Sequence, residues 1–180
     1  VKSAQLIDLN KHKGEHPRMG AIDVIPFVPV KDITEAECIE ISKRTAQRVW
    51  EEAKIPVFLY ESSASAPHRQ NLAAIRKGQF EGMAEKVKSP EWTPDYGTGI
   101  NPTAGVVAVG ARPPLVAYNI NLNTSDLTIA SNIAKIIRQS SGGLSYVKAL
   151  GVMLEDRKIA QVSINMTNYE KTPLYRVFEL

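Results

Sequence analysis

The tetrapeptide Ala111-Arg112-Pro113-Pro114 is the feature that most constrains how this chain of 180 residues can fold. Proline lacks the amide hydrogen that helices and central strands require, so no regular element can run through two consecutive prolines. Regular hydrophobic patterns lie on both sides of this break, and 43% of all residues are hydrophobic. We therefore predict two units, residues 1–112 and 113–180, and the chain is long enough to bury a core.

The pattern after the break predicts a mixed sheet and helix unit. The expected elements are a strand over 115–122, a helix through Arg138, a hairpin of strands over 147–154 and 158–165, and a helix beginning at Thr172-Pro173. The order strand, helix, strand, strand, helix makes up most of a ferredoxin-like unit.

The pattern before the break predicts comparable elements. They are a strand over 21–30, a helix from Thr34 to Ala53, a strand over 55–61, a helical segment over 68–76 and a buried strand over 105–110. Thr34 and Glu37 form a capping box at the start of the long helix. We expect an α+β fold with two ferredoxin-like α/β-sandwich subdomains in tandem, each with an antiparallel sheet and helices on one face.

Composition excludes several classes of protein. The formal charge is +3 with no long basic block, which does not favour a nucleic-acid partner. No apolar run approaches the roughly 20 residues of a membrane span, and Cys38 alone cannot form an internal disulfide. We expect a cytoplasmic protein without a membrane partner. Because the patterns over 4–11 and 172–180 resemble interrupted helices, we also expect a fragment of a longer protein.

Two of the three histidines, His12 and His16, lie four residues apart. A helical pair at this spacing could bind a metal, but Gly14 and Pro17 disfavour a regular helix and no third ligand stands out. A general acid or base is the better functional interpretation, because imidazole titrates near neutral pH and can accept or donate a proton. From the spacing alone, a tight turn in which His16 caps carbonyl groups is at least as well supported.

Several strings resemble the signature of the formiminotransferases, also called glutamate formimidoyltransferases. They are HKGEHPRMGAIDVIPFVPV at 12–30, AAIRKGQFEG at 73–82, PDYG at 94–97, NPTAGVVAVGAR at 101–112 and AYNINL at 117–122. The resemblance covers essentially the whole chain. Relative to that family, the chain lacks the start of the first subdomain, the end of the second, and the cyclodeaminase domain that some members carry.

The resemblance implies transfer of a formimino group from N-formimino-L-glutamate to tetrahydrofolate, with release of L-glutamate in histidine degradation. Tetrahydrofolate would be a cosubstrate, and no metal is implied. The family's two ferredoxin-like subdomains form a cleft for the folate, and its members are homodimers. The catalytic histidine of the family falls on His16, and its glycine-rich folate loop falls on about Gly97 to Gly105.

The chemistry agrees with a histidine in that place. Attack of the N5 amine on the amidine carbon gives a tetrahedral intermediate that must expel the glutamate nitrogen, a poor leaving group without a proton. His16 could accept the proton from N5 and deliver one to the departing amine, which typically contributes about 10²–10⁴-fold to the rate. Holding both cosubstrates together would supply further acceleration.

The other candidate substrate-binding residues are Arg18, Asp23, Gly97, Gly99, Asn101, Thr103, Gly105 and Arg112. Arg18 could bind a substrate carboxylate as a two-pronged donor, or pair with Glu15. Asp23 could orient a histidine, contact the pterin or cap backbone amides. The glycines would let the backbone approach a flat ligand, and Arg112 could meet the glutamate tail of folate or line the junction between the units.

Two other functions are also compatible with the sequence. A noncatalytic folate-binding or assembly module would keep the fold without turnover, and would bind tetrahydrofolate without forming product. A metal-dependent hydrolase would use His12 and His16 as ligands, and metal analysis of the purified protein would identify it.

Overall fold

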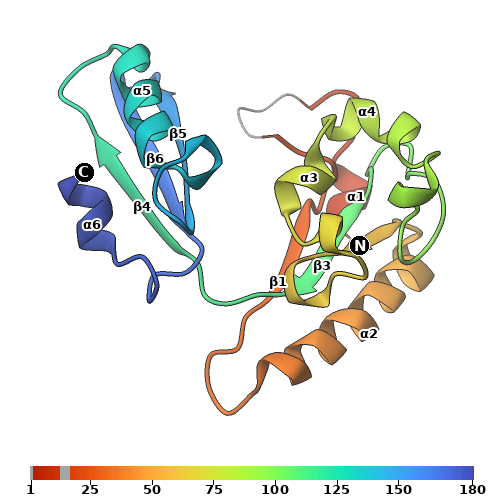
Figure 1. Cartoon of the computed structure of the whole chain (residues 1–180). Coiled ribbons are helices and arrows are strands. Elements are labelled where there is room, and N and C mark those ends of the chain that lie inside the picture. The colour runs from red at the N-terminus through yellow and green to blue at the C-terminus, as the bar shows by residue number, and fades with distance from the viewer. Residues whose placement is uncertain (1, 13–16) are drawn as a thin grey trace. The chain divides into compact units, whose positions relative to one another are not determined.

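The computed structural model describes residues 2–12 and 17–180 and divides the chain into two compact units, Val1–Arg112 and Pro113–Leu180 (Figure 1). Each unit contains its own three-stranded sheet and its own hydrophobic core. The prediction of two tandem units of mixed sheet and helix is therefore confirmed. Within the described ranges, no helix has both the length and the apolar character that a membrane crossing requires.

The first unit contains a parallel sheet with the strand order β1-β3-β2. Its strands are β1 (Val24–Phe27), β2 (Val57–Leu59) and β3 (Val107–Ala111). Every residue of β2 and β3 is buried, as is typical of parallel strands covered on both faces. The prediction of an antiparallel sheet in this unit is wrong, because helical crossovers rather than hairpins connect the strands.

Helix α2 (Glu35–Ala53) packs on one face of this sheet (Figure 1). The predicted capping box is confirmed, with the Thr34 hydroxyl accepting from the Glu37 amide and the Glu37 carboxylate accepting from the Thr34 amide. The core on this face includes Ala46 of the helix and Val107 and Val109 of β3. Cys38 is buried in the same helix, in line with an apolar packing role.

Helices α3 (Leu72–Arg76) and α4 (Gln79–Lys86) bring apolar side chains to the opposite face. Ile75 and Met83 join the core formed there with Phe58 and Ala108. The expectation of helices on one face is thus also wrong for this unit, whose sheet lies between two helical layers. The helix α1 (Lys2–Leu6) is shorter than the predicted 4–11, and α4 has no counterpart in the prediction.

The second unit matches the expected antiparallel arrangement. Its elements are β4 (Val116–Asn121), α5 (Leu127–Ile137), β5 (Val147–Leu154), β6 (Ile159–Met166) and α6 (Leu174–Glu179). The antiparallel sheet has the order β4-β6-β5, which is that of the first three strands of a ferredoxin-like unit. Ala130 and Ala134 of α5 and Val177 of α6 join one core, so both helices cover the same face.

The other face of this second sheet carries polar side chains along β4 and β6. Asn119 lies opposite Ser163 and Asn121 lies opposite Gln161 in the strand register. The Gln161 amide donates to the Asn121 side-chain oxygen at 2.7 Å. The two asparagines therefore share one face of β4.

Candidate functional site

The candidate catalytic residue His16 lies outside the described residues, and so does Glu15. The structure describes the chain on either side, up to His12 and again from Pro17. The neighbours that these two stretches contact in the first unit make up the described part of the candidate site.

Arg18 forms a two-pronged ion pair with Glu81 of α4. Its Nη1 lies 2.9 Å from Glu81 Oε2, and its Nη2 lies 2.7 Å from Glu81 Oε1. Nη2 also donates to the backbone carbonyl of His12 at 3.1 Å. These hydrogen bonds from Arg18 hold the pKa of the Glu81 carboxyl at about 2 and raise the pKa of Arg18. The guanidinium is thus engaged by the protein itself, with a partner that neither sequence alternative named.

Asp23 bonds to the protein through both carboxylate oxygens. Oδ1 accepts from the Met19 backbone amide at 2.7 Å, and Oδ2 forms an ion pair with Arg76 of α3. The first contact is the backbone cap that the sequence allowed for this residue. The second ties the turn before β1 to the end of α3, so Asp23 supports the shape of the candidate site.

Gly20 and Gly105 pair across a narrow seam in which two backbones touch. A Cβ atom at Gly20 would lie 1.8 Å from the Val106 carbonyl oxygen. At Gly105, where φ is +68°, a Cβ would lie 2.1 Å from the Met19 carbonyl oxygen. Neither position can accept a side chain, and this close approach joins the stretch after His16 to the predicted folate loop.

The remaining loop glycines, Gly97 and Gly99, have different surroundings. A Cβ at Gly97 would lie 2.5 Å from the Trp50 ring, so this glycine accommodates an indole of α2. A Cβ at Gly99 would have no neighbour within 4 Å. Of these two glycines, Gly99 is the one with room for a ligand beside it.

Asn101 and Thr103 shape the same loop from within. The Asn101 side-chain oxygen accepts from the amides of Thr103 and Ala104 at 3.2 and 2.9 Å. The Thr103 hydroxyl also donates to it, and the Thr103 carbonyl accepts from the Leu9 amide. The structure thus gives both residues a role in turn geometry.

Arg112 follows β3, where its backbone amide donates to the Phe27 carbonyl at 3.0 Å. Its side chain interacts with Tyr60, whose hydroxyl group is buried. Burial raises the pKa of the Tyr60 hydroxyl, while the positive charge of Arg112 opposes that rise. Arg112 is therefore a cation at the end of the sheet that contains β3.

A pocket of about 370 Å³ lies at the turn between α3 and α4. Its lining consists of Pro17, Ala73, Arg76, Lys77, Gly78 and Gln79. Pro17 is joined to His16 by a peptide bond, so the pocket adjoins the candidate catalytic residue in sequence. Arg76, Lys77 and Gln79 were not sequence candidates, although they lie in a string that carries the resemblance. The Arg-Lys-Gly turn between two helices is the signal that could have found them.

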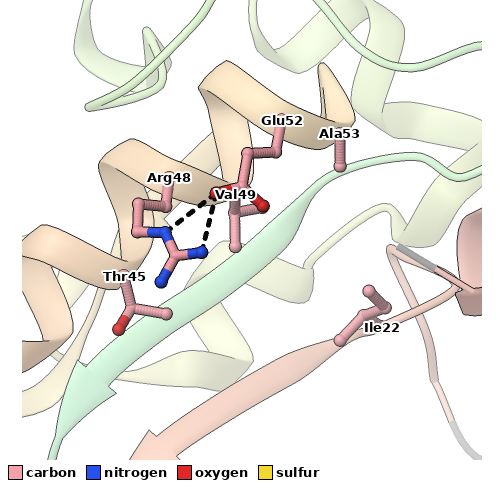
Figure 2. A pocket seen from close by; sticks show the side chains of 6 residues that line it. All are labelled: Ile22, Thr45, Arg48, Val49, Glu52 and Ala53. Atoms are coloured by element: carbon pink, nitrogen blue, oxygen red, sulfur yellow. Dashed lines mark hydrogen bonds and ion pairs between the residues drawn. The ribbon is translucent and has the colours of Figure 1, made fainter.

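Another pocket, of about 160 Å³, lies beside α2 and is lined by Ile22, Thr45, Arg48, Val49, Glu52 and Ala53. Figure 2 shows Arg48 and Glu52 paired on the helix and Ile22 across from them. The Arg48 Nε donates to Glu52 Oε1 at 2.9 Å, which satisfies both charges. None of the sequence candidates lines this pocket.

A buried ion pair between Arg69 and Asp95 fixes the chain just before the loop. The pair spans 3.0 Å, and the two side chains are 9% and 10% exposed. Asp95 also accepts from the Leu59 amide at 2.8 Å, and Arg69 donates to the Glu91 carbonyl at 2.7 Å. His68 lies edge-on to Trp92 beside this pair. Arg69 is thus a packing residue that anchors the chain leading into Gly97.

The described residues contain no group of three or more histidine, cysteine, aspartate or glutamate side chains placed to hold a metal ion. His12, one of the two ligands that a metal site was considered to use, is exposed, and His16 is outside the described part.

Comparison with known protein families matches both units. The model of the formiminotransferase domain, N-terminal subdomain, matches residues 1–112, and the model of the formiminotransferase domain matches residues 117–180.

Curated relatives cover nearly all of this chain. A glutamate formimidoyltransferase of Streptococcus pyogenes serotype M1 is 65% identical over 178 residues, which is 98% of this chain and 60% of the relative. One from Thermoplasma acidophilum is 47% identical over 180 residues, 99% of this chain and 59% of the relative. The mouse formimidoyltransferase-cyclodeaminase is 45% identical over 184 residues, 98% of this chain and 34% of the relative. The chain therefore spans about 60% of the length of the first two relatives.

Proposed function

Because the chain belongs to the formiminotransferase domain family, we propose that it carries the transfer site of a glutamate formimidoyltransferase. The reaction moves a formimino group from N-formimino-L-glutamate to tetrahydrofolate and releases L-glutamate in histidine degradation. The observation that carries the proposal is the pocket at the α3–α4 turn, because its wall includes Pro17, the neighbour of His16 in sequence. Its volume of about 370 Å³ suits a ligand the size of a glutamyl group.

His16 is the general acid and base in this proposal. It accepts a proton from the attacking amine of the folate and delivers a proton to the departing nitrogen of glutamate. General acid–base catalysis of this kind typically contributes about 10²–10⁴-fold. No covalent bond to the protein forms, and binding both substrates side by side supplies further acceleration.

In this proposal the neighbouring residues position the segment that contains His16. Arg18 and Asp23 hold the chain after His16 against α4 and α3, through Glu81 and Arg76. This arrangement supports a positioning role for Arg18 in place of the direct contact with substrate that the sequence allowed.

The folate lies along the loop from Gly97 to Gly105 in this proposal. The open space around Gly99 supports an approach of the ligand there, and Asn101, Thr103 and Gly105 maintain the loop. Arg112 offers a positive charge for the glutamate tail of the folate. Asp23 supports the turn from which these contacts are made.

The wider setting is also part of the proposal. Tetrahydrofolate acts as a cosubstrate and no metal takes part, and the protein works as a homodimer in the cytoplasm without nucleic-acid or membrane partners. Metal analysis of the purified protein tests whether a metal takes part, and sedimentation equilibrium tests whether the protein is a dimer.

The deciding experiment measures L-glutamate release from N-formimino-L-glutamate with tetrahydrofolate, first with this chain and then with the full-length parent. We expect His16→Ala to lower kcat at least about 100-fold while the affinity for folate stays within a few-fold. His12→Ala should have a smaller effect. Equal losses of rate and folate affinity in the His16 variant would instead indicate a structural histidine. Folate binding by both proteins without glutamate release would favour the noncatalytic module.

A further inference from the structure

The pocket at the α3–α4 turn carries a positive charge that has no counter-charge among the described residues. Of the cations around it, Arg18 is paired with Glu81 and Arg76 with Asp23. The Lys77 ammonium is exposed and forms no hydrogen bond or ion pair in the described part of the chain. The ammonium of Lys86 adds further positive charge behind the turn, where it donates to the Lys77 carbonyl at 3.3 Å.

Arg76 also has unused hydrogen-bonding capacity at this place. Its Nη2 contacts Asp23, but its Nε is buried and has no hydrogen-bond partner among the described residues. A guanidinium presents donors in a planar fork that suits a carboxylate. The Arg76 side chain is 30% exposed, so a ligand oxygen can reach the accessible part of this guanidinium.

The backbone adds two donors at the same turn. The amides of Gly78 and Gln79 make no hydrogen bond in the described part of the chain, and both residues line the pocket. They stand at the start of α4, an eight-residue helix whose N-terminal end favours negative charge. Gly78 has a φ of +93°, so the turn adopts a conformation that suits glycine.

We propose that this pocket is a carboxylate-binding site in which Lys77, Arg76 and the amides of Gly78 and Gln79 hold one carboxylate of a glutamyl group. The inference rests on the proposed function for the identity of the glutamyl ligand. Two sources share this chemistry, namely the formimino-glutamate donor and the glutamate tail of the folate. Arg18, the carboxylate binder suggested by the sequence, does not serve here because Glu81 occupies its two terminal nitrogens.

Direct binding tests the site without requiring turnover. The ¹⁵N-labelled chain is titrated with N-acetyl-L-glutamate, which imitates the donor, and separately with p-aminobenzoyl-L-glutamate, which imitates the folate tail. We expect saturable shifts of the Gly78 and Gln79 amide resonances with at least one ligand. Saturation by the first ligand assigns the donor as the source, and saturation by only the second assigns the folate tail. Absence of saturable shifts at these amides with both ligands overturns the proposal.

Matched variants test the named side chains. Lys77→Ala should weaken binding at least about fivefold, because it removes the unpaired charge. Arg76→Lys keeps the charge but loses the planar fork, and should weaken binding about threefold or more. Lys88→Ala removes the same charge from an exposed position beyond α4 and should leave the dissociation constant within about twofold. Equal affinities of the Lys77 and Lys88 variants would overturn the proposal. If binding behaves as expected but the unmodified protein shows no formimino transfer, only the proposed function is refuted and the carboxylate site stands.

Discussion

Arg18 and Glu81, 63 positions apart in the chain, meet through two parallel hydrogen bonds of 2.9 and 2.7 Å. The same guanidinium donates to the His12 carbonyl. One side chain therefore joins α4 to the residues on both sides of the stretch that contains His16. A planar, permanently charged fork is needed for these contacts, and lysine could not reproduce them.

The Arg18–Glu81 pair should make stability depend on pH in the acid range. The folded-state pKa of Glu81 is about 2, compared with 4.5 for an unpaired glutamate, so protons bind preferentially to the unfolded chain. The stabilisation is complete above about pH 4.5 and is lost as the pH falls through about 2. In urea unfolding between pH 6 and 3, the advantage of the wild type over Glu81→Gln should shrink. Glu85→Gln on the same helix serves as the control, and a constant advantage of the wild type over Glu81→Gln would contradict the assignment.

The close backbone contact between Gly105 and Met19 should leave no room for a methyl group at position 105. Gly105→Ala places a Cβ 2.1 Å from a backbone oxygen at a φ of +68°, and we expect it to lower the free energy of unfolding by more than about 3 kcal/mol. Gly99→Ala has a similar φ of +64° and open surroundings, so it should cost only about 1 kcal/mol. Chemical denaturation of both variants measures the difference. Similar losses would mean that conformational strain, rather than the contact with Met19, sets the cost.

The buried ion pair of Arg69 and Asp95 should contribute strongly to stability. Asp95→Ala leaves the Arg69 guanidinium buried without its partner, and we expect a loss of about 3–5 kcal/mol. The exposed pair of Arg48 and Glu52 provides the comparison, and Glu52→Ala should cost less than about 1 kcal/mol. Thermal and urea unfolding give both values. An Arg69→Met and Asp95→Ala double variant should lose less than the sum of the two single losses.

Lys86 should stabilise the end of α3. Its ammonium donates to the carbonyls of Ala74 and Ile75 and lies 3.9 Å from the centre of the Trp92 ring. Lys86→Met keeps much of the aliphatic stem but loses these contacts, and should cost about 1–2 kcal/mol. Hydrogen exchange should report the loss first in α3. Lys88→Met is the matched control, and equal destabilisation by the two would show that these contacts contribute nothing specific.

The sequence predicted the locally encoded parts of the fold. The capping box of Thr34 and Glu37 lies within one helical turn, and the hairpin of β5 and β6 is specified by alternation on both sides of a short turn. The strand after the prolines alternates in burial as its sequence alternates in polarity. Such features depend on neighbours a few positions apart, so a single sequence is enough to identify them.

The direction of the first sheet was missed for a physical reason. β2 and β3 are short, uniformly apolar strands, and a buried strand has no polar face to indicate its partner. A second reason is the unpredicted helix α4, whose glycine at position 82 weakens a helical pattern. Because α4 was not predicted, the segment between β2 and β3 could not be identified as a helical crossover that covers one face of the sheet.

By itself the sequence determined where most of the helices and strands of this protein lie, with the exception of α4. It also determined how the long helix starts and which strings resemble a formimino-transfer site. Only the tertiary structure decided that Arg18 pairs with Glu81 and Asp23 with Arg76. It also placed Lys77 at the α3–α4 turn without an ion-pair partner among the described residues. Periodicity and capping act over one or two turns of chain. Charge pairing depends on which distant segments the sheet brings together, and nothing local in the sequence specifies that choice.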